Sequence, residues 1–291
     1  MTQQDGQRVA VVTGASSGLG KAAATALAAQ GWHVIAHGRD PERTAAAQVD
    51  LRAAAAPGAK VDVVRGDLAL LSDTARLARE IARLTDKVHV MINNAGGVRS
   101  ELVMTPEGNE ATFAGNHLGH FLLTNRLMPL LRAAAAGSKP GSVRVLSVTS
   151  DGHEGCPGLD WDDLQQVRDW RSGKSYCLAK LCNILFTREL GRRVAAYGMV
   201  ANSMHPGVVT SNFVKHAEPR MRSYIETLES FPPEVAGDAL VWLATAPEAG
   251  GVTGGYFCKR ESRAPAAAAL DDKVAARLWT ESEALVRRAG V

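Results

Sequence analysis

Short runs of apolar, often β-branched residues alternate along this chain with longer alanine-rich stretches that have the period of an amphipathic helix. The apolar runs show no regular change between apolar and polar positions, which is typical of strands covered on both faces. We predict strands at Arg8–Thr13, Trp32–His37, Lys60–Arg65, Val88–Asn93, Ser142–Val148, Val200–His205 and Gly254–Phe257. We predict helices at Leu19–Gln30, Glu42–Ala56, Leu70–Thr85, Asn109–Ala135, Ser175–Tyr197, Pro233–Ala246 and Asp271–Arg288.

This order of elements predicts an α/β fold with a doubly wound parallel sheet of the Rossmann type and helices on both faces. We find no internal repeat, and we expect residues 1–291 to form a single domain that ends in a helix at 271–288. Two long segments without periodicity, 151–174 and 207–232, follow the carboxyl ends of predicted strands. Ligands bind at that edge of an open parallel sheet, so we expect substrate loops there. Surface insertions without a function are the alternative.

Composition and charge narrow the class of protein. The 46% of hydrophobic and 22% of charged residues are ordinary for a globular chain, and the net charge is only +3. No basic stripe with interleaved aromatic residues is present, so we expect no nucleic-acid partner. The polar N-terminus and the lack of any apolar stretch of about 18 residues predict no membrane anchor and a cytoplasmic location. The four cysteines form no CxxC pair, and we expect reduced thiols and no metal site.

A glycine-rich turn joins the first predicted strand to the first helix. Glycines let backbone amides approach a pyrophosphate, and the helix N-terminus adds free N–H groups and a positive dipole end. A turn of this kind between strand and helix at the start of an α/β chain predicts a dinucleotide site. Its expected contact residues are Gly14, Ser16, Ser17, Gly18, Leu19 and Gly20.

The end of the second predicted strand bears on the choice between NAD and NADP. An acidic side chain there would bind the ribose 2′-hydroxyl, whereas this strand is followed by Arg39, which can pair with a 2′-phosphate. We therefore expect NADP(H), with NAD(H) as the less favoured cofactor. Asp40 leaves an alternative open, because it could pair with Arg39 or reach the ribose itself.

Four motifs occur in a fixed order: TGASSGLG at 13–20, NNAG at 93–96, YCLAK at 176–180 and HPG at 205–207. Together they resemble the short-chain dehydrogenase/reductase superfamily, over roughly residues 8–286. The local sequences at residues 116–121 and 176–186 are similar to those of the retinol dehydrogenase-like branch. Membrane-bound retinol dehydrogenases carry an apolar N-terminal anchor that this sequence does not show, so retinoid specificity is not carried over.

Tyr176 and Lys180 are four residues apart, so a helix presents both on one face. A phenol titrates near 10, and an adjacent ammonium group favours the phenolate. Bringing the pKa of Tyr176 to about 7 needs about 4 kcal/mol, which we expect from Lys180 together with an oxidised nicotinamide. In the reducing direction the phenol gives its proton to the carbonyl oxygen as hydride reaches the carbon.

The resemblance implies further roles. Lys180 would also hold the nicotinamide ribose, Ser150 would bind the substrate oxygen, and Asn116 would hold a water in a proton relay. Ser147 and Thr149 have similar chemistry to Ser150, and a structural amide is the alternative for Asn116. The remaining residues expected at the cofactor are Asp67, Leu68, Asn94, Ala95, Gly96, Pro206, Gly207, Val209 and Thr210, besides Tyr176 and Lys180.

The sequence leaves two roles open for Asp67 and for His153. Asp67 could contact the adenine or cap a helix N-terminus. His153 follows Ser150 closely and could touch the substrate, whereas His117, on a mostly apolar helix, is expected to be structural. The aromatic and aliphatic side chains of the two long segments are expected to form an apolar pocket with few charged anchors. Those side chains are Cys156, Leu159, Trp161, Trp170, Phe213, Val214, Met221, Tyr224, Ile225, Leu228 and Phe231.

The sequence thus predicts an NADP(H)-dependent oxidoreductase that interconverts a carbonyl and an alcohol on a small lipophilic substrate. The alternative is a non-catalytic NADP-binding sensor or scaffold, although such proteins tend to lose the tyrosine or the lysine. An extended-branch epimerase or dehydratase would need a larger C-terminal part than the roughly 85 residues after His205. Because the superfamily is mostly oligomeric through the helices that bear Asn116 and Tyr176, we also expect a homodimer.

Overall fold

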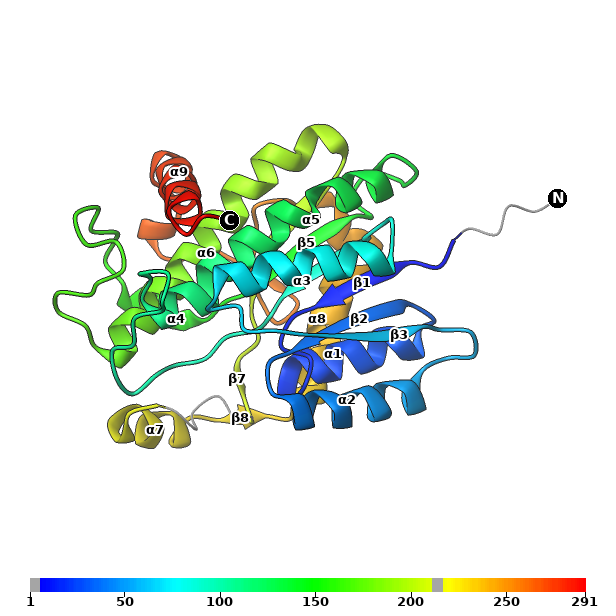
Figure 1. Cartoon of the computed structure of the whole chain (residues 1–291), viewed down its shortest axis with the longest axis horizontal. Helices are drawn as coiled ribbons and strands as arrows, with labels where there is room; N and C mark the ends of the chain where they lie inside the picture. Colours follow the sequence, from blue (N-terminus) through cyan, green and yellow to red (C-terminus); the bar gives the residue numbers. More distant parts are fainter. Residues whose placement is uncertain (1–5, 211–216) are drawn as a thin grey trace.

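The computed structural model describes residues 6–210 and 217–291 of the chain. Its central sheet has eight strands in the described residues, in the order β3-β2-β1-β4-β5-β6-β9-β10 (Figure 1). The strands are β1 (Val9–Val12), β2 (His33–Gly38), β3 (Val61–Arg65), β4 (Val90–Asn93), β5 (Arg144–Val148), β6 (Val200–His205), β9 (Tyr256–Cys258) and β10 (Glu261–Arg263).

The inner strands are parallel and almost fully buried, which explains why their sequences are continuous apolar runs. At the centre of the sheet Val11 of β1 lies between Ile35 of β2 and Met91 of β4. Because these strands run in one direction, their carboxyl ends and the loops that follow them meet along a single edge.

Helices cover both faces of the sheet (Figure 1). One apolar core joins the sheet to α1, α2 and α8, and a second joins its other face to α3, α5 and α6. The C-terminal helix α9 packs on the outer side of α6. These helices are α1 (Gly18–Ala29), α2 (Pro41–Ala54), α3 (Leu71–Leu84), α5 (Gly119–Ala135), α6 (Ser172–Val194), α8 (Pro233–Thr245) and α9 (Asp272–Arg288).

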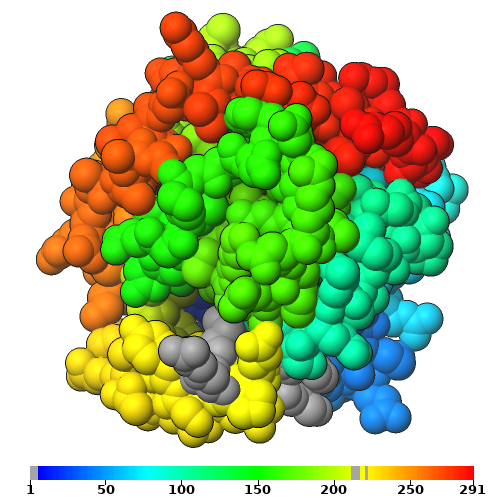
Figure 2. Space-filling view, turned by 90° about the vertical axis from the view of Figure 1, so that its left-hand side faces the viewer, coloured from blue at the N-terminus to red at the C-terminus, as the bar shows by residue number. Residues whose placement is uncertain are grey.

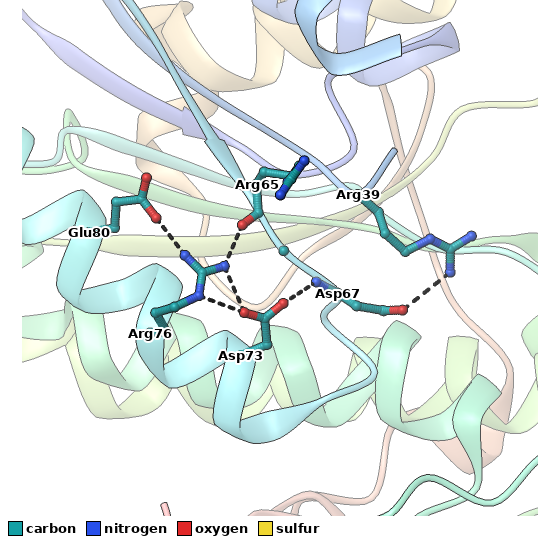
Figure 3. Close-up of a pocket in the computed structure, with 7 residues that line it drawn as sticks. Arg39, Arg65, Asp67, Asp73, Arg76 and Glu80 are labelled. Atoms are coloured by element: carbon teal, nitrogen blue, oxygen red, sulfur yellow. Dashed lines mark hydrogen bonds and ion pairs between the residues drawn. The ribbon is translucent and has the colours of Figure 1, made fainter. Parts of the chain in front are cut away.

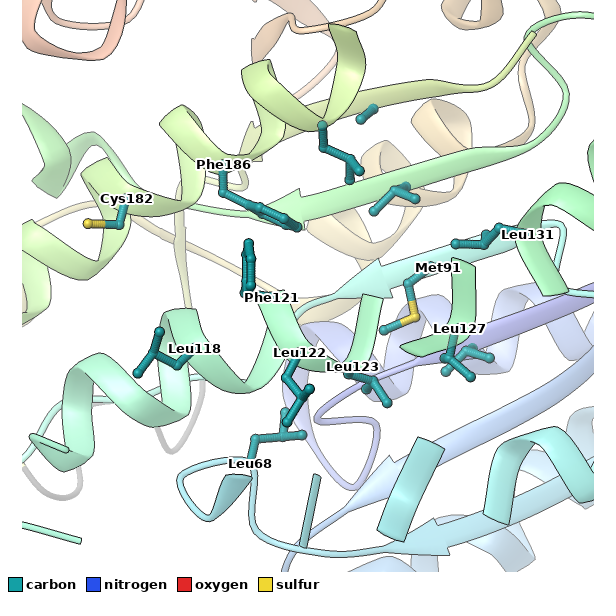
Figure 4. Packing of buried hydrophobic residues seen from close by; sticks show 14 of the residues in the cluster. Leu68, Met91, Leu118, Phe121, Leu122, Leu123, Leu127, Leu131, Cys182 and Phe186 are labelled. Carbon is teal, nitrogen blue, oxygen red and sulfur yellow. The ribbon is translucent and has the colours of Figure 1, made fainter. Parts of the chain in front are cut away.

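The core under α5 and α6 is closed by aromatic rings (Figure 4). Phe121 of α5 and Phe186 of α6 face each other edge to face with ring centroids 5.7 Å apart. Trp279 of α9 completes this cluster, at 4.9 Å from Phe121 and 5.7 Å from Phe186. Aromatic contacts of this geometry add to the free energy of burial. The C-terminal helix is therefore built into the core and is not an appendage.

The predicted doubly wound Rossmann-type sheet is confirmed, with three additions that the sequence pattern did not indicate. The edge strand β10 runs antiparallel to β9, in a stretch where the sequence pattern predicted no strand. Within the segment 207–232, β7 (Val208–Val209) pairs with β8 (Ser230–Phe231), and α7 (Pro219–Glu226) lies between them in sequence. Elements of two, three and eight residues are too short to produce a clear period.

The helix predicted at Asn109–Ala135 is interrupted near its start. A short α4 (Ala111–Phe113) leads into a π-helical turn, Ala114–Leu118, and only then into α5. A π-helical turn widens the backbone spacing by one residue and frequently marks a functional site. Here the turn contains Asn116, one of the candidate catalytic residues.

Candidate functional site

A cleft of about 1120 Å³ opens at the carboxyl edge of the sheet. Figure 2 looks toward this side of the molecule and shows a hollow between the yellow segment around α7 and the green segment that follows β5. The structure brings all the site residues expected from the sequence to the lining of this one cleft. From the glycine turn to the end of β6 they are Gly14, Ser16, Ser17, Gly18, Leu19, Gly20, Arg39, Asp67, Leu68, Asn94, Ala95, Gly96, Asn116, Ser150, Tyr176, Lys180, Pro206, Gly207, Val209 and Thr210.

The glycine turn is shaped to hold a phosphate group. Gly14 and Gly18 have φ angles of +67° and +54°, a region that favours glycine. A Cβ atom on Gly20 would lie 2.5 Å from the Gly14 carbonyl oxygen, so the turn also packs too closely for a side chain. The N-cap residue of α1, Ser17, makes no side-chain capping bond, and the first turn of this helix holds no acidic residue. Its N–H groups and positive dipole end are therefore suited to an anionic ligand.

Thr13 fixes the glycine turn to the strand end of β4, a function that the sequence pattern did not reveal. Its buried hydroxyl accepts hydrogen bonds from the Asn94 and Ala95 N–H groups at 2.8 and 2.9 Å. The Asn94 side chain returns a bond to the Thr13 carbonyl at 2.8 Å. Asn94 is thereby a brace between two loops that both line the cleft.

Arg39 and Asp40 take separate partners at the end of β2. The Asp40 carboxylate accepts a hydrogen bond from the Arg43 N–H at 2.9 Å and caps α2, and this contact holds the pKa of Asp40 below its usual range. Arg39 instead lies 3.5 Å from Asp67 (Figure 3). Asp40 is thus engaged with its own helix. Arg43 also lines the cleft, and sequence reasoning missed it.

Asp67 does not cap a helix in the way that one alternative proposed. Helix α3 begins at Leu71 with Leu70 at the N-cap, and Asp67 accepts a bond from the Ala69 N–H at 3.0 Å. A side pocket of about 640 Å³ next to it is lined by three arginines and three acidic residues (Figure 3). Two of these six, Arg39 and Asp67, belong to both cavities, so the side pocket adjoins the cleft.

Ser150, Tyr176 and Lys180 meet in the middle of the cleft. Tyr176 and Lys180 are 8% and 4% exposed and share one face of α6, with the Lys180 Nζ 5.4 Å from the centre of the Tyr176 ring. The Lys180 ammonium donates to the Val148 carbonyl at 3.2 Å. The Ser150 side chain hydrogen-bonds to Tyr176, accepts from the Gly152 N–H and donates to Asp151 Oδ1, the latter two at 3.0 Å.

Burial dominates the titration of the two α6 residues. It raises the pKa of Tyr176 well above 10, and the hydrogen bond between Tyr176 and Ser150 offsets only part of this change. It lowers the pKa of Lys180 to about 8. The groups of the protein alone therefore do not bring the pKa of the Tyr176 phenol toward 7. The positive charge of an oxidised nicotinamide bound nearby would favour the phenolate.

The side-chain amide of Asn116 hydrogen-bonds to the backbone through both its nitrogen and its oxygen. Its side-chain amide donates to the Gly97 carbonyl at 3.0 Å and to the Thr112 carbonyl at 2.8 Å, and its Oδ1 accepts from the Gly97 N–H at 3.2 Å. A Cβ atom on Gly96 would lie 2.5 Å from Asn116 Oδ1 and 3.4 Å from Lys180 Nζ. Asn116, Gly96 and Lys180 therefore converge below the middle of the cleft.

The segment 151–174 does not supply the apolar pocket wall that we expected. Cys156 is buried in the core, and Leu159 and Trp161 pack against it, with Trp161 under the Arg277 guanidinium of α9. Neither these three residues nor Trp170 line the cleft. The expectation was wrong because the segment folds back onto the C-terminal helix, which sequence spacing could not show.

His153 is buried and serves the backbone, not a substrate. Its Nε2 accepts from the Ala266 N–H at 3.0 Å, and its Nδ1 donates to the Ser150 carbonyl at 2.7 Å. Both ring nitrogens are thus occupied, and the histidine fixes the chain next to Ser150.

The substrate end of the cleft is formed by two other segments. One is 97–103, after β4, which the sequence did not single out and which contributes Val98 and Val103. The other consists of residues 207–210 and 224–230, from which Tyr224, Ile225 and Leu228 line the cleft. Phe231 does not line the cleft, and the Lys259 Nζ lies 3.9 Å from the centre of its ring. The expected contacts Phe213 and Val214, and the side chain of Met221, lie outside the described residues.

Charged groups also line this end, contrary to our expectation of few. The cleft lining includes the carboxylates Asp151, Glu154 and Glu226, together with Glu101 and Arg99. Acidic side chains thus outnumber basic ones at the substrate end of the described lining. Within residues 6–210 and 217–291 no cluster of three or more metal-ligating side chains occurs.

The chain shows clear similarity to known proteins. Residues 8–156 match the family model for short chain dehydrogenases. Human retinol dehydrogenase 13 is 37% identical over 96% of this chain and 84% of its own length, and human retinol dehydrogenase 14 is 36% identical over 96% and 86%.

A solved structure agrees with these sequence matches. The crystal structure of an uncharacterized protein from Mycobacterium paratuberculosis superposes with a TM-score of 0.73 at 30% identity, covering 97% of this chain and 94% of the other. This chain belongs to the short-chain dehydrogenase family of oxidoreductases, and it resembles the retinol dehydrogenases within that family.

Proposed function

We propose that this protein is an NADP(H)-dependent oxidoreductase that interconverts a carbonyl and an alcohol on a small lipophilic substrate. One observation carries the proposal: Ser150 is bonded to Tyr176, and Lys180 lies beside them, in a cleft whose other end is a glycine turn and an uncapped helix N-terminus. A nicotinamide cofactor would supply or accept the hydride. The residues of the chain bind, orient and move the proton.

In the reducing direction Tyr176 Oη gives its proton to the carbonyl oxygen, and the carbon receives the hydride and its electron pair. The Ser150 hydroxyl, now directed at Asp151, would turn to the same oxygen and stabilise the charge that develops there. Lys180 would hold the nicotinamide ribose and favour the phenolate that remains on Tyr176. Asn116 would support Lys180 from below.

Replacing Tyr176 by phenylalanine tests this assignment. The Tyr176→Phe variant keeps the ring that packs in the cleft and loses only the proton donor, so turnover should fall by about 10²–10⁴-fold. NADPH affinity, measured by fluorescence titration, should change little. Turnover above a tenth of the wild-type rate, with hydride transfer rate-limiting, would contradict the role. Tight NADPH binding by a wild-type protein inactive on every carbonyl tried would instead favour the sensor or scaffold.

The preference for NADP rests on Arg39 and Arg43. Both line the cleft at the end of β2, and the carboxylate of Asp40 is already held by the Arg43 N–H. Arg39 is half exposed and has only a 3.5 Å contact with Asp67, so it is available to a 2′-phosphate.

The Arg39→Ala variant should therefore weaken NADPH binding by about 1.5–2 kcal/mol, the lower part of the range for charged hydrogen bonds, because water screens this site. NADH affinity should stay nearly constant. Arg65→Ala is the matched control, since Arg65 lines only the side pocket. If wild-type protein binds NADH more tightly than NADPH, the assignment of NADP is wrong.

The substrate proposal rests on the lining between the two segments that follow β4 and β6. Val98, Val103, Ile225 and Leu228 provide apolar surface, and the carboxylates around them disfavour anionic substrates. Each buried CH₂ should add about 0.8 kcal/mol, or roughly fourfold in kcat/KM. A homologous series of aldehydes and ketones tests this. A flat or falling trend, or preference for a phosphorylated substrate, would refute it.

Oligomeric state and location stay predictions. The helices expected to form a homodimer, α5 and α6, carry α9 across part of their outer face, with Trp279 against both. A dimer would have to use the remaining surface, which light scattering can test. In the described part of the chain, no helix combines the length and apolar character that crossing a bilayer requires.

A further inference from the structure

A chain of buried polar side chains leads from the C-terminal helix to Asn116, and no step of the chemistry above uses it. Ser282 of α9 lies 2.9 Å from His117 Nε2. His117 Nδ1 lies 3.3 Å from Asn183 Oδ1, and Asn183 Nδ2 donates to the Asn116 carbonyl at 3.0 Å. Ser282 and His117 are wholly buried, and the two asparagines are 3% exposed.

The direction of every bond in this chain is fixed by its last member. A carbonyl oxygen only accepts, so the Asn183 amide must direct its NH₂ group at Asn116 and its oxygen at His117. His117 must then carry its proton on Nδ1, which leaves Nε2 to accept from the Ser282 hydroxyl. Burial lowers the pKa of His117 to about 4, so the ring is neutral at pH 7, as this arrangement requires.

A second arm reaches the same carbonyl from the glycine turn. His120 Nδ1 lies 3.0 Å from the Asn116 carbonyl, and its Nε2 lies 2.9 Å from the Thr13 hydroxyl. Burial lowers the pKa of His120 to about 3, so this ring is neutral too. The carbonyl of Asn116 therefore accepts two bonds, one from each arm, at the π-helical turn.

The packing around the chain leaves it little freedom. The His117 ring lies 5.2 Å from the Phe113 ring and 6.2 Å from the Phe186 ring. Trp279, one turn before Ser282 on α9, is stacked on Phe186. The aromatic cluster thus holds α9 at the distance at which Ser282 can reach His117.

We propose that Ser282, His117 and Asn183 are positioning residues that transmit the docking of helix α9 to Asn116, and through it to the backbone of Gly97 in the cleft. The expected effect on turnover rests on the proposed function. The expected effect on the backbone is independent of that function, because Asn116 Oδ1 accepts directly from the Gly97 N–H. Loss of this chain of hydrogen bonds should weaken the bond between Asn116 and Gly97, and should displace the residues next to Lys180.

The test combines a variant of the polar chain with a packing control on the same helix. Ser282→Ala removes the donor to His117 at the far end from the cleft, and Leu278→Val trims a buried α9 side chain outside the chain of bonds. We expect Ser282→Ala to speed amide hydrogen exchange of residues 94–100 about three- to tenfold, the equivalent of one hydrogen bond. Leu278→Val should lower Tm without this change.

Turnover provides the second readout. Ser282→Ala should lower kcat by a similar factor, with KM and NADPH affinity within about twofold, and Ser282→Thr should restore it. In a double-mutant cycle with Asn183→Ala, the two losses should not add, because both break one chain. If the Asn183→Ala variant does not fold, the Ser282→Ala and Ser282→Thr variants alone still test the inference.

Two outcomes would overturn the inference. The first is that Ser282→Ala leaves the rate of amide hydrogen exchange in residues 94–100 unchanged, or raises it no more than Leu278→Val does. The other is full additivity of the Ser282 and Asn183 effects on kcat. A wild-type protein without turnover on any carbonyl would contradict the proposed function instead, and the exchange measurement would still test the positioning chain.

Discussion

Lys180 should make the folded protein less stable at neutral pH, because the fold buries an ammonium group. The side chain is 4% exposed, and burial lowers its pKa from the ordinary 10.5 to about 8. Each pKa unit is worth about 1.4 kcal/mol, so keeping the proton on the buried group costs the folded state about 3 kcal/mol. Its hydrogen bond to the Val148 carbonyl returns about 1 kcal/mol of that.

The Lys180→Met variant keeps the apolar stem and removes the charge. At pH 7 we expect it to be more stable than the wild type by about 2 kcal/mol, which is about 4 °C in Tm for a domain of this size. Turnover should be lost. Between pH 8 and 10.5 the unfolded chain binds more protons at Lys180 than the folded one, so wild-type stability rises with pH relative to the variant. By about pH 10 the two proteins should be nearly equal.

Urea unfolding of cofactor-free protein at pH 7 and pH 10 measures this difference. Lys139→Met, at an exposed position, is the control and should show no such dependence on pH. A variant less stable than the wild type at pH 7 would refute the reasoning. So would a gain of equal size at both pH values, because it would come from packing and not from the charge.

Two further substitutions test the cofactor turn and the C-terminal helix. Gly20→Ala places a Cβ atom 2.3 Å from Asn94 Nδ2 and 2.5 Å from the Gly14 carbonyl oxygen, so NADPH affinity should fall at least about tenfold in a fluorescence titration; affinity within twofold would contradict the geometry. Trp279→Ala removes a 5% exposed ring from the cluster with Phe121 and Phe186, and should cost about 3–5 kcal/mol in urea unfolding. A loss below about 1 kcal/mol would show that α9 is not part of the core.

The sequence predicted the sheet and the location of the cleft well because both depend on local patterns. Buried parallel strands are continuous apolar runs, and the residues after their carboxyl ends must meet at one edge. Gly14, Arg39, Asn94, Ser150 and Lys180 therefore line one cleft although they come from five separate segments. Only their positions relative to strand ends were needed to bring them together.

What the sequence could not provide depends on contacts between distant segments. The sequence left Arg39 or the ribose as partners of Asp40, whereas the geometry of α2 gives it the Arg43 N–H, which the sequence analysis had not considered. The apolar side chains of residues 151–174 read as a pocket wall, but Trp161 lies under Arg277, more than a hundred residues away. The hydrophobicity of a side chain predicts that it will be buried, but it does not predict which part of the molecule will cover it.

The titration of Tyr176 and Lys180 bears on the proton transfer proposed for this site. Burial raises the pKa of Tyr176 and lowers that of Lys180 to about 8, so near pH 7 the phenol is protonated and the ammonium still mostly charged. In the proposed mechanism this is the state that gives a proton to a carbonyl. Oxidation of an alcohol would need the phenolate, which burial disfavours. If Tyr176 acts as proposed, the cofactor-free site therefore already holds the proton that carbonyl reduction consumes, and oxidation requires that proton to leave Tyr176 first.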